Sequence, residues 1–221
     1  MKILAVDTTF GACSVALRQG ERRLAHRFER MERGHAEALA PMVEEAMRAS
    51  GISFSELDRL GVTTGPGTFT GQRVGLAFMR GLRVALKRPL VGVTSLAAMA
   101  RQAMEETGER LAASIHDARR DEVYFEPRGA GEAGARLMRF GEAVAVVEIL
   151  ALSGTVALAG TAAPRLHERC AARAISTRLS AILAPDADWV ARLCAEAPLS
   201  AEVPKPLYLR EPDAKLPASR S

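Results

Sequence analysis

The order of strand-like and helix-like segments repeats along this chain, and this repetition restricts the possible folds more than any other feature. Short apolar or alternating runs predict strands, and apolar stripes with spacings of three and four predict helices. In residues 1–104 the order is three strands, helix, strand, helix, strand and helix. We predict strands at Ile3–Val6, Cys13–Leu17, Arg22–Phe28, Leu60–Thr63 and Leu90–Val93, and helices at about Glu37–Met47, Phe69–Leu86 and Ser95–Met104.

The residues that follow begin with the same order. We predict strands at Leu111–His116, Glu122–Phe125, Arg136–Phe140 and Val156–Ala159, and helices at Val144–Leu152, Pro164–Ala174 and Trp189–Ala197. Two rounds of one order predict a duplicated α/β unit, so we expect two lobes, residues 1–104 and 105–198. We expect residues 199–221 to form a partly disordered extension, with Lys215–Ser221 disordered at its end.

The composition fits a globular protein outside the membrane. Hydrophobic residues make up 48% of the chain, yet no apolar run reaches the roughly 18 residues that a membrane span needs. Lys2 is followed by a strand-like run and not by the apolar core of a secretory signal, so we expect a cytoplasmic protein. Cys13, Cys170 and Cys194 form no CxxC pair, which argues against a disulfide scaffold or a zinc site.

The charge pattern leaves direct nucleic-acid binding open. The net charge of +4 fits a partner that carries phosphates. The basic residues are scattered, however, and aromatic residues are only 5% of the chain, so no base-stacking platform is evident.

Two segments contain residues with special chemical or conformational properties. The first strand ends at Asp7, Thr8 and Thr9, which fits a phosphate-binding turn but also a plain turn. GPGTFTGQRVG, at residues 65–75, places a sharp turn before a helix that contains Gly71 and Gly75, four apart. A helical glycine costs about 1 kcal/mol relative to alanine, so something packs closely on that face. That neighbour is either the lobe's own sheet or a partner helix.

Together these segments resemble the TsaB family. The resemblance is carried by the Asp7–Thr9 opening, the GPGTFTGQRVGL stretch, Gly92–Leu96, Asp117–Arg119 and Tyr208–Arg210. It runs from residue 4 to residue 215 and is weakest between about 127 and 155.

The resemblance implies an actin/Hsp70/sugar-kinase-like (ASKHA) fold, in which each lobe has a mixed sheet with an antiparallel meander plus helices. It implies a non-catalytic subunit needed for N6-threonylcarbamoylation of adenosine 37 in ANN-decoding tRNAs. Such a subunit docks on and activates the catalytic subunit TsaD, with a TsaE-type ATPase as third member. ATP and metal would be used by those partners, tRNA would be reached through the complex, and the isolated chain would form a homodimer.

The implied docking surface is the helix pair of the first lobe, about Glu37–Met47 and Phe69–Leu82. Two such pairs would bury apolar side chains in a four-helix bundle. The interface residues that we predict are Leu39, Met42, Val43, Phe69, Gly71, Arg73, Val74, Gly75 and Phe78. The alternative, that these residues face only the lobe's own sheet, is left open by the sequence.

We predict no catalytic residue and no metal site in this chain. In the related catalytic subunit two histidines four apart hold a metal, whereas Ser95 and Met99 stand at those places here and are poor ligands. No GxSxG elbow and no Walker A motif occurs. We expect no strongly bound cofactor, and the residues that we name for a degenerate nucleotide cleft are Asp7, Thr8, Asp117 and Gly160.

The alternative function is a stand-alone enzyme of the same fold. It would be a nucleotide-dependent kinase or a glycoprotease-like metallopeptidase. Either would require an ATP cleft or a metal site within this chain.

Overall fold

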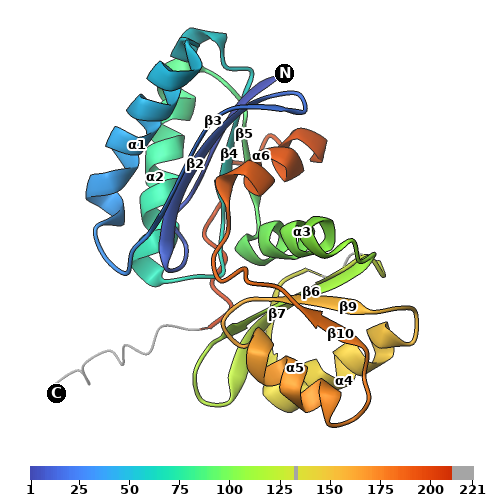
Figure 1. Cartoon of the computed structure of the whole chain (residues 1–221). Coiled ribbons are helices and arrows are strands. Elements are labelled where there is room, and N and C mark those ends of the chain that lie inside the picture. Colours follow the sequence, from blue (N-terminus) through green and yellow to red (C-terminus); the bar gives the residue numbers. More distant parts are fainter. Residues whose placement is uncertain (132–133, 211–221) are drawn as a thin grey trace, which may run out of the picture.

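The computed structural model describes residues 1–131 and 134–210 and has two lobes, each built on a five-stranded sheet (Figure 1). The first part of the chain forms β1 (Lys2–Asp7), β2 (Ala12–Gln19), β3 (Arg22–Arg30), α1 (His35–Ser50), the 3-10 helix η1 (Phe54–Glu56), β4 (Arg59–Thr63), α2 (Phe69–Leu86), β5 (Leu90–Val93) and α3 (Ser95–Thr107). The second part forms β6 (Leu111–Asp117), β7 (Glu122–Arg128), β8 (Arg136–Arg139), α4 (Phe140–Ala151), β9 (Val156–Ala159), α5 (Ala163–Ala171), β10 (Thr177–Leu179) and α6 (Ala187–Glu196).

The two sheets have the same topology. Their strand orders are β3-β2-β1-β4-β5 and β8-β7-β6-β9-β10. In each sheet the first three strands form an antiparallel meander, and the last two continue parallel to the first strand. The predicted duplication of one α/β unit is therefore confirmed.

The last helix of each unit packs on the sheet of the other lobe. The α3 helix contacts β6, β7 and β9, whereas α6 contacts β1, β2, β4 and β5. Figure 1 shows α3 and α6 between the two sheets, and α1 and α2 side by side on the outer face of the first sheet. All strands of the first sheet come before residue 104 in the chain, and all strands of the second sheet come after it. The α3 and α6 helices, however, each pack on the sheet of the other lobe, so the domain limits stay a prediction.

The core of the first lobe lies between its sheet and the outer helices. Leu4 and Val6 of β1 contribute to it from the sheet, and Leu76 and Met79 contribute from α2. The buried positions of α1 are three and four residues apart, which is the spacing of one helix face.

In the second lobe two predictions, at Phe140 and at the end of α5, differ from the structure, and one strand was missed. Phe140 begins α4 instead of ending a strand, because its N–H bonds to Asp121 O at 2.9 Å and the Arg139 N–H bonds to a carboxylate of the first turn. The α5 helix ends at Ala171, short of Ala174, whose φ of 55° lies outside the helical region. The three-residue strand β10 was not predicted.

Part of the C-terminal extension is ordered against the lobes. Arg80 donates to Pro204 O, the Leu207 N–H donates to Thr64 O at 2.8 Å, and Arg210 forms an ion pair with Glu122 of β7. The disorder expected for residues 215–221 lies outside the described residues. Among the described residues, no helix is both long and apolar enough to cross a membrane.

Candidate functional site

The outward sides of α1 and α2 form a surface of small and apolar residues, which we call the helix-pair face. Its exposed members are Ala36, Ala40 and Pro41 of α1, and Ala77, Gly81, Val84 and Ala85 of α2. Those on α2 are three or four apart and therefore share one side of the helix. Val84 is 72% exposed. Small side chains let another helix approach closely, so this face is a candidate docking surface.

Charges are divided between the two helices of this face. Exposed Glu37 and Glu44 lie on α1, together with Arg48 at its end, whereas Arg73 and half-exposed Arg83 lie on α2. An acidic helix beside a basic helix is complementary to a second such pair related by a two-fold axis.

Five of the nine predicted interface residues lie inside the lobe. Leu39, Met42 and Val43 are at most 4% exposed and pack in the core, and Gly71 and Gly75 are also buried. We correct these five to core residues, because the side of each helix that carries them faces the sheet.

The other four predicted interface residues are at least partly accessible. Phe69 is 51% exposed and Arg73 is also exposed. Val74 and Phe78 are half-buried at the edge of the core. Their contact with a partner stays a prediction.

Thr8 accounts for Gly71 and Gly75, two of the three glycines of α2. Its Oγ1 donates to Gly71 O at 2.6 Å and accepts from the Gly75 N–H at 3.0 Å. A Cβ on Gly75 would lie 2.7 Å from Thr8 Oγ1, and a Cβ on Gly71 would overlap Thr8 O. Tight packing within the lobe is therefore enough to explain both glycines.

The four residues named for a nucleotide cleft do not line one cavity. Asp7 and Thr8 are 0% and 1% exposed, and the Thr68 N–H bonds to the backbone of their turn and closes it. Gly160 is buried as well. Asp117 alone is exposed and lines a cleft between the lobes.

The Asp7 carboxyl is enclosed and only partly hydrogen-bonded. Its Oδ1 accepts from Thr9 Oγ1 at 2.6 Å and Thr63 Oγ1 at 2.5 Å, whereas Oδ2 has no partner among the described residues. Burial raises the pKa of Asp7 to about 6, although the hydrogen bonds from Thr63 and Thr9 act in the opposite direction. Asp7 therefore braces the turn after β1.

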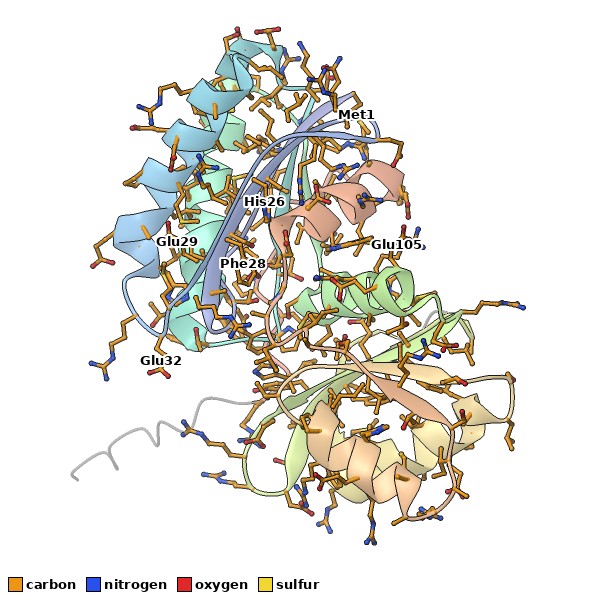
Figure 2. All side chains as sticks on the ribbon, viewed as in Figure 1. Met1, His26, Phe28, Glu29, Glu32 and Glu105 are labelled. Carbon is orange, nitrogen blue, oxygen red and sulfur yellow. The ribbon has the colours of Figure 1, made fainter. Side chains whose placement is uncertain are left out.

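Two cavities lie between the lobes, and His116 lines both. A cleft of about 470 Å³ is formed by residues 66–69 of the first lobe, 116–119 of the second and 207–210 of the tail. A larger groove of about 1000 Å³ includes His26 and Phe28 of β3, which Figure 2 shows on that strand.

An aromatic contact joins the lobes between these cavities. The ring of Phe10 stacks on His116 with a centroid distance of 3.7 Å. Burial lowers the pKa of His116 to about 4, so the imidazole is neutral at pH 7.

Ser95 and Met99 are both fully buried at the start of α3. Ser95 Oγ donates to Pro66 O at 2.5 Å, and Met99 belongs to an apolar cluster. Within residues 1–131 and 134–210, no group of three His, Cys, Asp or Glu side chains is arranged to hold a metal ion. His35 is a structural residue, since its Nε2–H donates to Phe10 O at 3.0 Å.

The contacts that the tail makes with α2 were not predicted from the sequence. The Arg73 Nε–H donates to Tyr208 Oη at 2.9 Å, and the rings of Phe69 and Tyr208 stack with centroids 5.7 Å apart. One feature of the sequence could have predicted these contacts: Tyr208, one of only two tyrosines in the chain, lies in a proline-rich extension. A large ring in such a segment gains free energy by packing against the fold.

Comparisons with known proteins point to tRNA modification. The family model of "TsaD: tRNA N6-adenosine threonylcarbamoyltransferase" matches residues 29–152. The Escherichia coli "tRNA threonylcarbamoyladenosine biosynthesis protein TsaB" is 39% identical over 125 residues, which are 57% of this chain and 54% of the relative. The chain thus spans about half the length of this curated relative.

Other similarities extend along nearly the whole chain. An uncharacterized protein of Mycobacterium tuberculosis is 33% identical over 217 residues, covering 96% of this chain and 93% of the relative. The solved structure of YeaZ from Pseudomonas aeruginosa is 33% identical, with a TM-score of 0.75 and coverage of 94% of this chain and 99% of that one. The predicted two-lobed fold of the actin and sugar-kinase type is confirmed.

Proposed function

This chain belongs to the TsaB (YeaZ) family, and from that premise we propose that it is a partner subunit in the synthesis of threonylcarbamoyladenosine in tRNA. It docks on a TsaD-type catalytic subunit in the cytoplasm and activates it, and a TsaE-type ATPase completes the complex. The tRNA is bound by the assembled complex. The name of the Escherichia coli relative supports the role in this modification.

The observation that carries the docking proposal is the helix-pair face. It presents small and apolar residues on two adjacent helices, and Val84 in the last turn of α2 is 72% exposed. The family model of the transferase covers residues 29–152, which include α1 and α2, so a TsaD-type partner has counterparts of these helices. Two related helix pairs can form a four-helix bundle, and in isolation a second copy of this chain can occupy the same face.

We assign the chemistry to the partner subunits. Two buried side chains, Ser95 and Met99, stand where the metal-binding histidines of the catalytic relative are expected, and the Asp7 turn is closed. ATP and metal are then bound by the TsaD-type and TsaE-type partners.

The test is to mix the chain with the TsaD-type protein of its own organism. We expect light scattering after size exclusion to show a heterodimer, and threonylcarbamoyl transfer to tRNA to require both proteins. Val84→Arg should abolish the heterodimer and reduce transfer to the level without this chain, because a charge would be buried at the helix contact.

A matched control is Ile149→Arg on α4 of the second lobe, where the side chain is 66% exposed. This variant should bind as well as the wild type. A heterodimer that tolerates Val84→Arg would rule out docking through this face, and transfer by the isolated chain would favour the stand-alone enzyme instead.

A further inference from the structure

The ordered part of the tail is fastened beside the first turns of α2. We call residues 204–210 the tail strap. Its backbone accepts a hydrogen bond from Arg80 and donates one to Thr64, and Arg210 at its end reaches Glu122 of the second lobe. Figure 1 shows this segment at the junction of the lobes. Attachments at both ends of the strap hold Tyr208 in a fixed place next to α2.

Arg73 lies against two aromatic rings at this place. Its guanidinium carbon is 3.4 Å from the ring centroid of Phe69 and 5.8 Å from that of Tyr208. The Nε–H donates to Tyr208 Oη at 2.9 Å. The terminal nitrogens of Arg73 have no acceptor among the described residues, so their N–H groups are available to an external anion.

This arrangement reduces the cost of binding an anion. Stacking and the Nε hydrogen bond fix a side chain that otherwise loses much rotamer entropy when it binds. A guanidinium with free terminal N–H groups matches the two oxygens of a carboxylate. Aromatic residues and arginine are also the residue types that dominate binding energy in protein interfaces.

The arginine is continuous with the helix-pair face. Arg73, Ala77, Gly81 and Val84 follow one another at intervals of four, four and three along α2, so they share one side of the helix. Arg80, seven residues after Arg73, is half-buried and donates to Pro204 O, whereas the exposed residues Ala77, Gly81 and Val84 on this side are small or apolar. A protein helix with a carboxylate fits this place, because small and apolar side chains beside Arg73 let a second helix approach closely.

The charges of the face indicate which helix supplies that carboxylate. Packing α2 against α2 of a second copy would bring two basic helices together. Packing α2 against α1 of a second copy pairs Arg73 with an acidic helix, on which Glu37 and Glu44 are exposed.

We propose that Phe69, Arg73 and Tyr208 form an anchor for a carboxylate on α1 of a second copy of this chain. Arg73 makes the contact, and Tyr208 of the tail strap is the residue that positions it. The inference rests on the proposed function only in using the same helix-pair face. The proposal gives Tyr208 and the tail strap a role in dimer formation. The docking of the helices alone does not require such a role.

The test is the dimer dissociation constant of the full chain, measured by sedimentation over a range of concentrations. Arg73→Gln and Tyr208→Ala should each weaken the dimer about tenfold, which corresponds to about 1.4 kcal/mol and fits the loss of one hydrogen-bonded contact. Tyr208→Phe keeps the ring and loses the hydrogen bond, so its loss should be smaller. The double variant Glu37→Gln, Glu44→Gln should weaken the dimer as Arg73→Gln does, and combining all three changes should add little more.

The controls separate a lost anchor from a lost fold. Arg169→Ala removes an exposed arginine of α5 and should leave the dimer unchanged. Thermal unfolding should show that Tyr208→Phe and Arg73→Gln are folded. Wild-type affinity in both Arg73→Gln and Tyr208→Ala, additive losses with the glutamate changes, or a wild-type chain that stays monomeric would each overturn the anchor. None of these outcomes bears on the heterodimer, which is measured separately with the TsaD-type protein.

Discussion

Asp7 shows how burial changes the pKa of a carboxyl group. One of its oxygens accepts hydrogen bonds from Thr9 and Thr63, while the other has no partner among the described residues. A carboxylate in that place has lost its water without full compensation, which is why the pKa is raised to about 6. The folded state therefore prefers the protonated form of Asp7 more strongly than the unfolded state does.

Replacing Asp7 by Asn should change how stability depends on pH. The folded pKa lies above the unfolded value of 3.8, so the Asp7 contribution is fully present below pH 3.8 and is lost as the pH rises through about 6. The loss is roughly 3 kcal/mol by pH 7. We expect the stability of Asp7→Asn relative to wild type to increase by about that amount between pH 4 and pH 7 in urea unfolding.

The contribution of His116 has the opposite sign and can be separated in the same experiment. Its pKa is lowered to about 4, so its contribution is present above its ordinary value of 6.5 and is lost as the pH falls through 4. The wild-type curve should therefore be comparatively flat between pH 4 and pH 6, whereas Asp7→Asn should lose stability toward acid. Parallel curves for the two proteins would show that folding does not raise the pKa of Asp7.

At the scale of elements, α2 contains glycines with different surroundings. A Cβ on Gly75 would meet Thr8 Oγ1 at 2.7 Å, whereas a Cβ on Gly81 would meet nothing within 4 Å. Gly75→Ala should therefore destabilise the protein by roughly 1–3 kcal/mol through overpacking. Gly81→Ala should stabilise it by up to about 1 kcal/mol, because alanine favours the helix.

Urea unfolding of the two variants against wild type provides the measurement, and Gly81→Ala is the matched control within one helix. Equal effects in the two variants would mean that helix propensity alone decides, and that the contact with Thr8 costs nothing. Loss of stability in Gly75→Ala alone would support the assignment of this glycine to the lobe's own packing.

The helices also show where prediction from sequence succeeds and where it stops. Apolar spacing placed α1 and α2 within a few residues of their observed limits, because a helix face repeats regularly. The same spacing does not say what covers the face. Leu39 and Met42 were assigned to a partner, yet the lobe's own sheet covers them, and the exposed side consists of small residues such as Ala77.

Short or exposed elements leave a weaker pattern. The β10 strand has three residues, none of them buried, so neither alternation nor an apolar run marks it. Only the duplication requires a strand there, as the counterpart of β5. The closure of the Asp7 turn by residues 65–68 depends on contacts far apart in the sequence, which local patterns do not contain.

At the scale of the whole molecule, the exchange of α3 and α6 makes each lobe depend on the other half of the chain. Ile3 and Val91 of the first sheet lie in one cluster with Trp189 and Val190 of α6. An amphipathic stripe shows that α6 must cover something, but it does not identify which sheet. The repeated order of elements therefore predicted two lobes without predicting this exchange.

The exchange leads to a prediction about the isolated first lobe. Residues 1–104 alone lack α6 and leave the inner face of the sheet open, so we expect no cooperative unfolding transition in urea, followed by circular dichroism. Residues 1–94 joined by a flexible linker to residues 186–198 restore the cover and should unfold cooperatively, with Trp189 fluorescence changing in the same transition. Val190→Asp in the fused chain should abolish that transition, because Val190 is 0% exposed and its replacement buries an unpaired charge. A cooperative transition in residues 1–104 alone would show that the first sheet folds without α6. The two lobes would then be held together by the contacts of α3 and the tail strap instead.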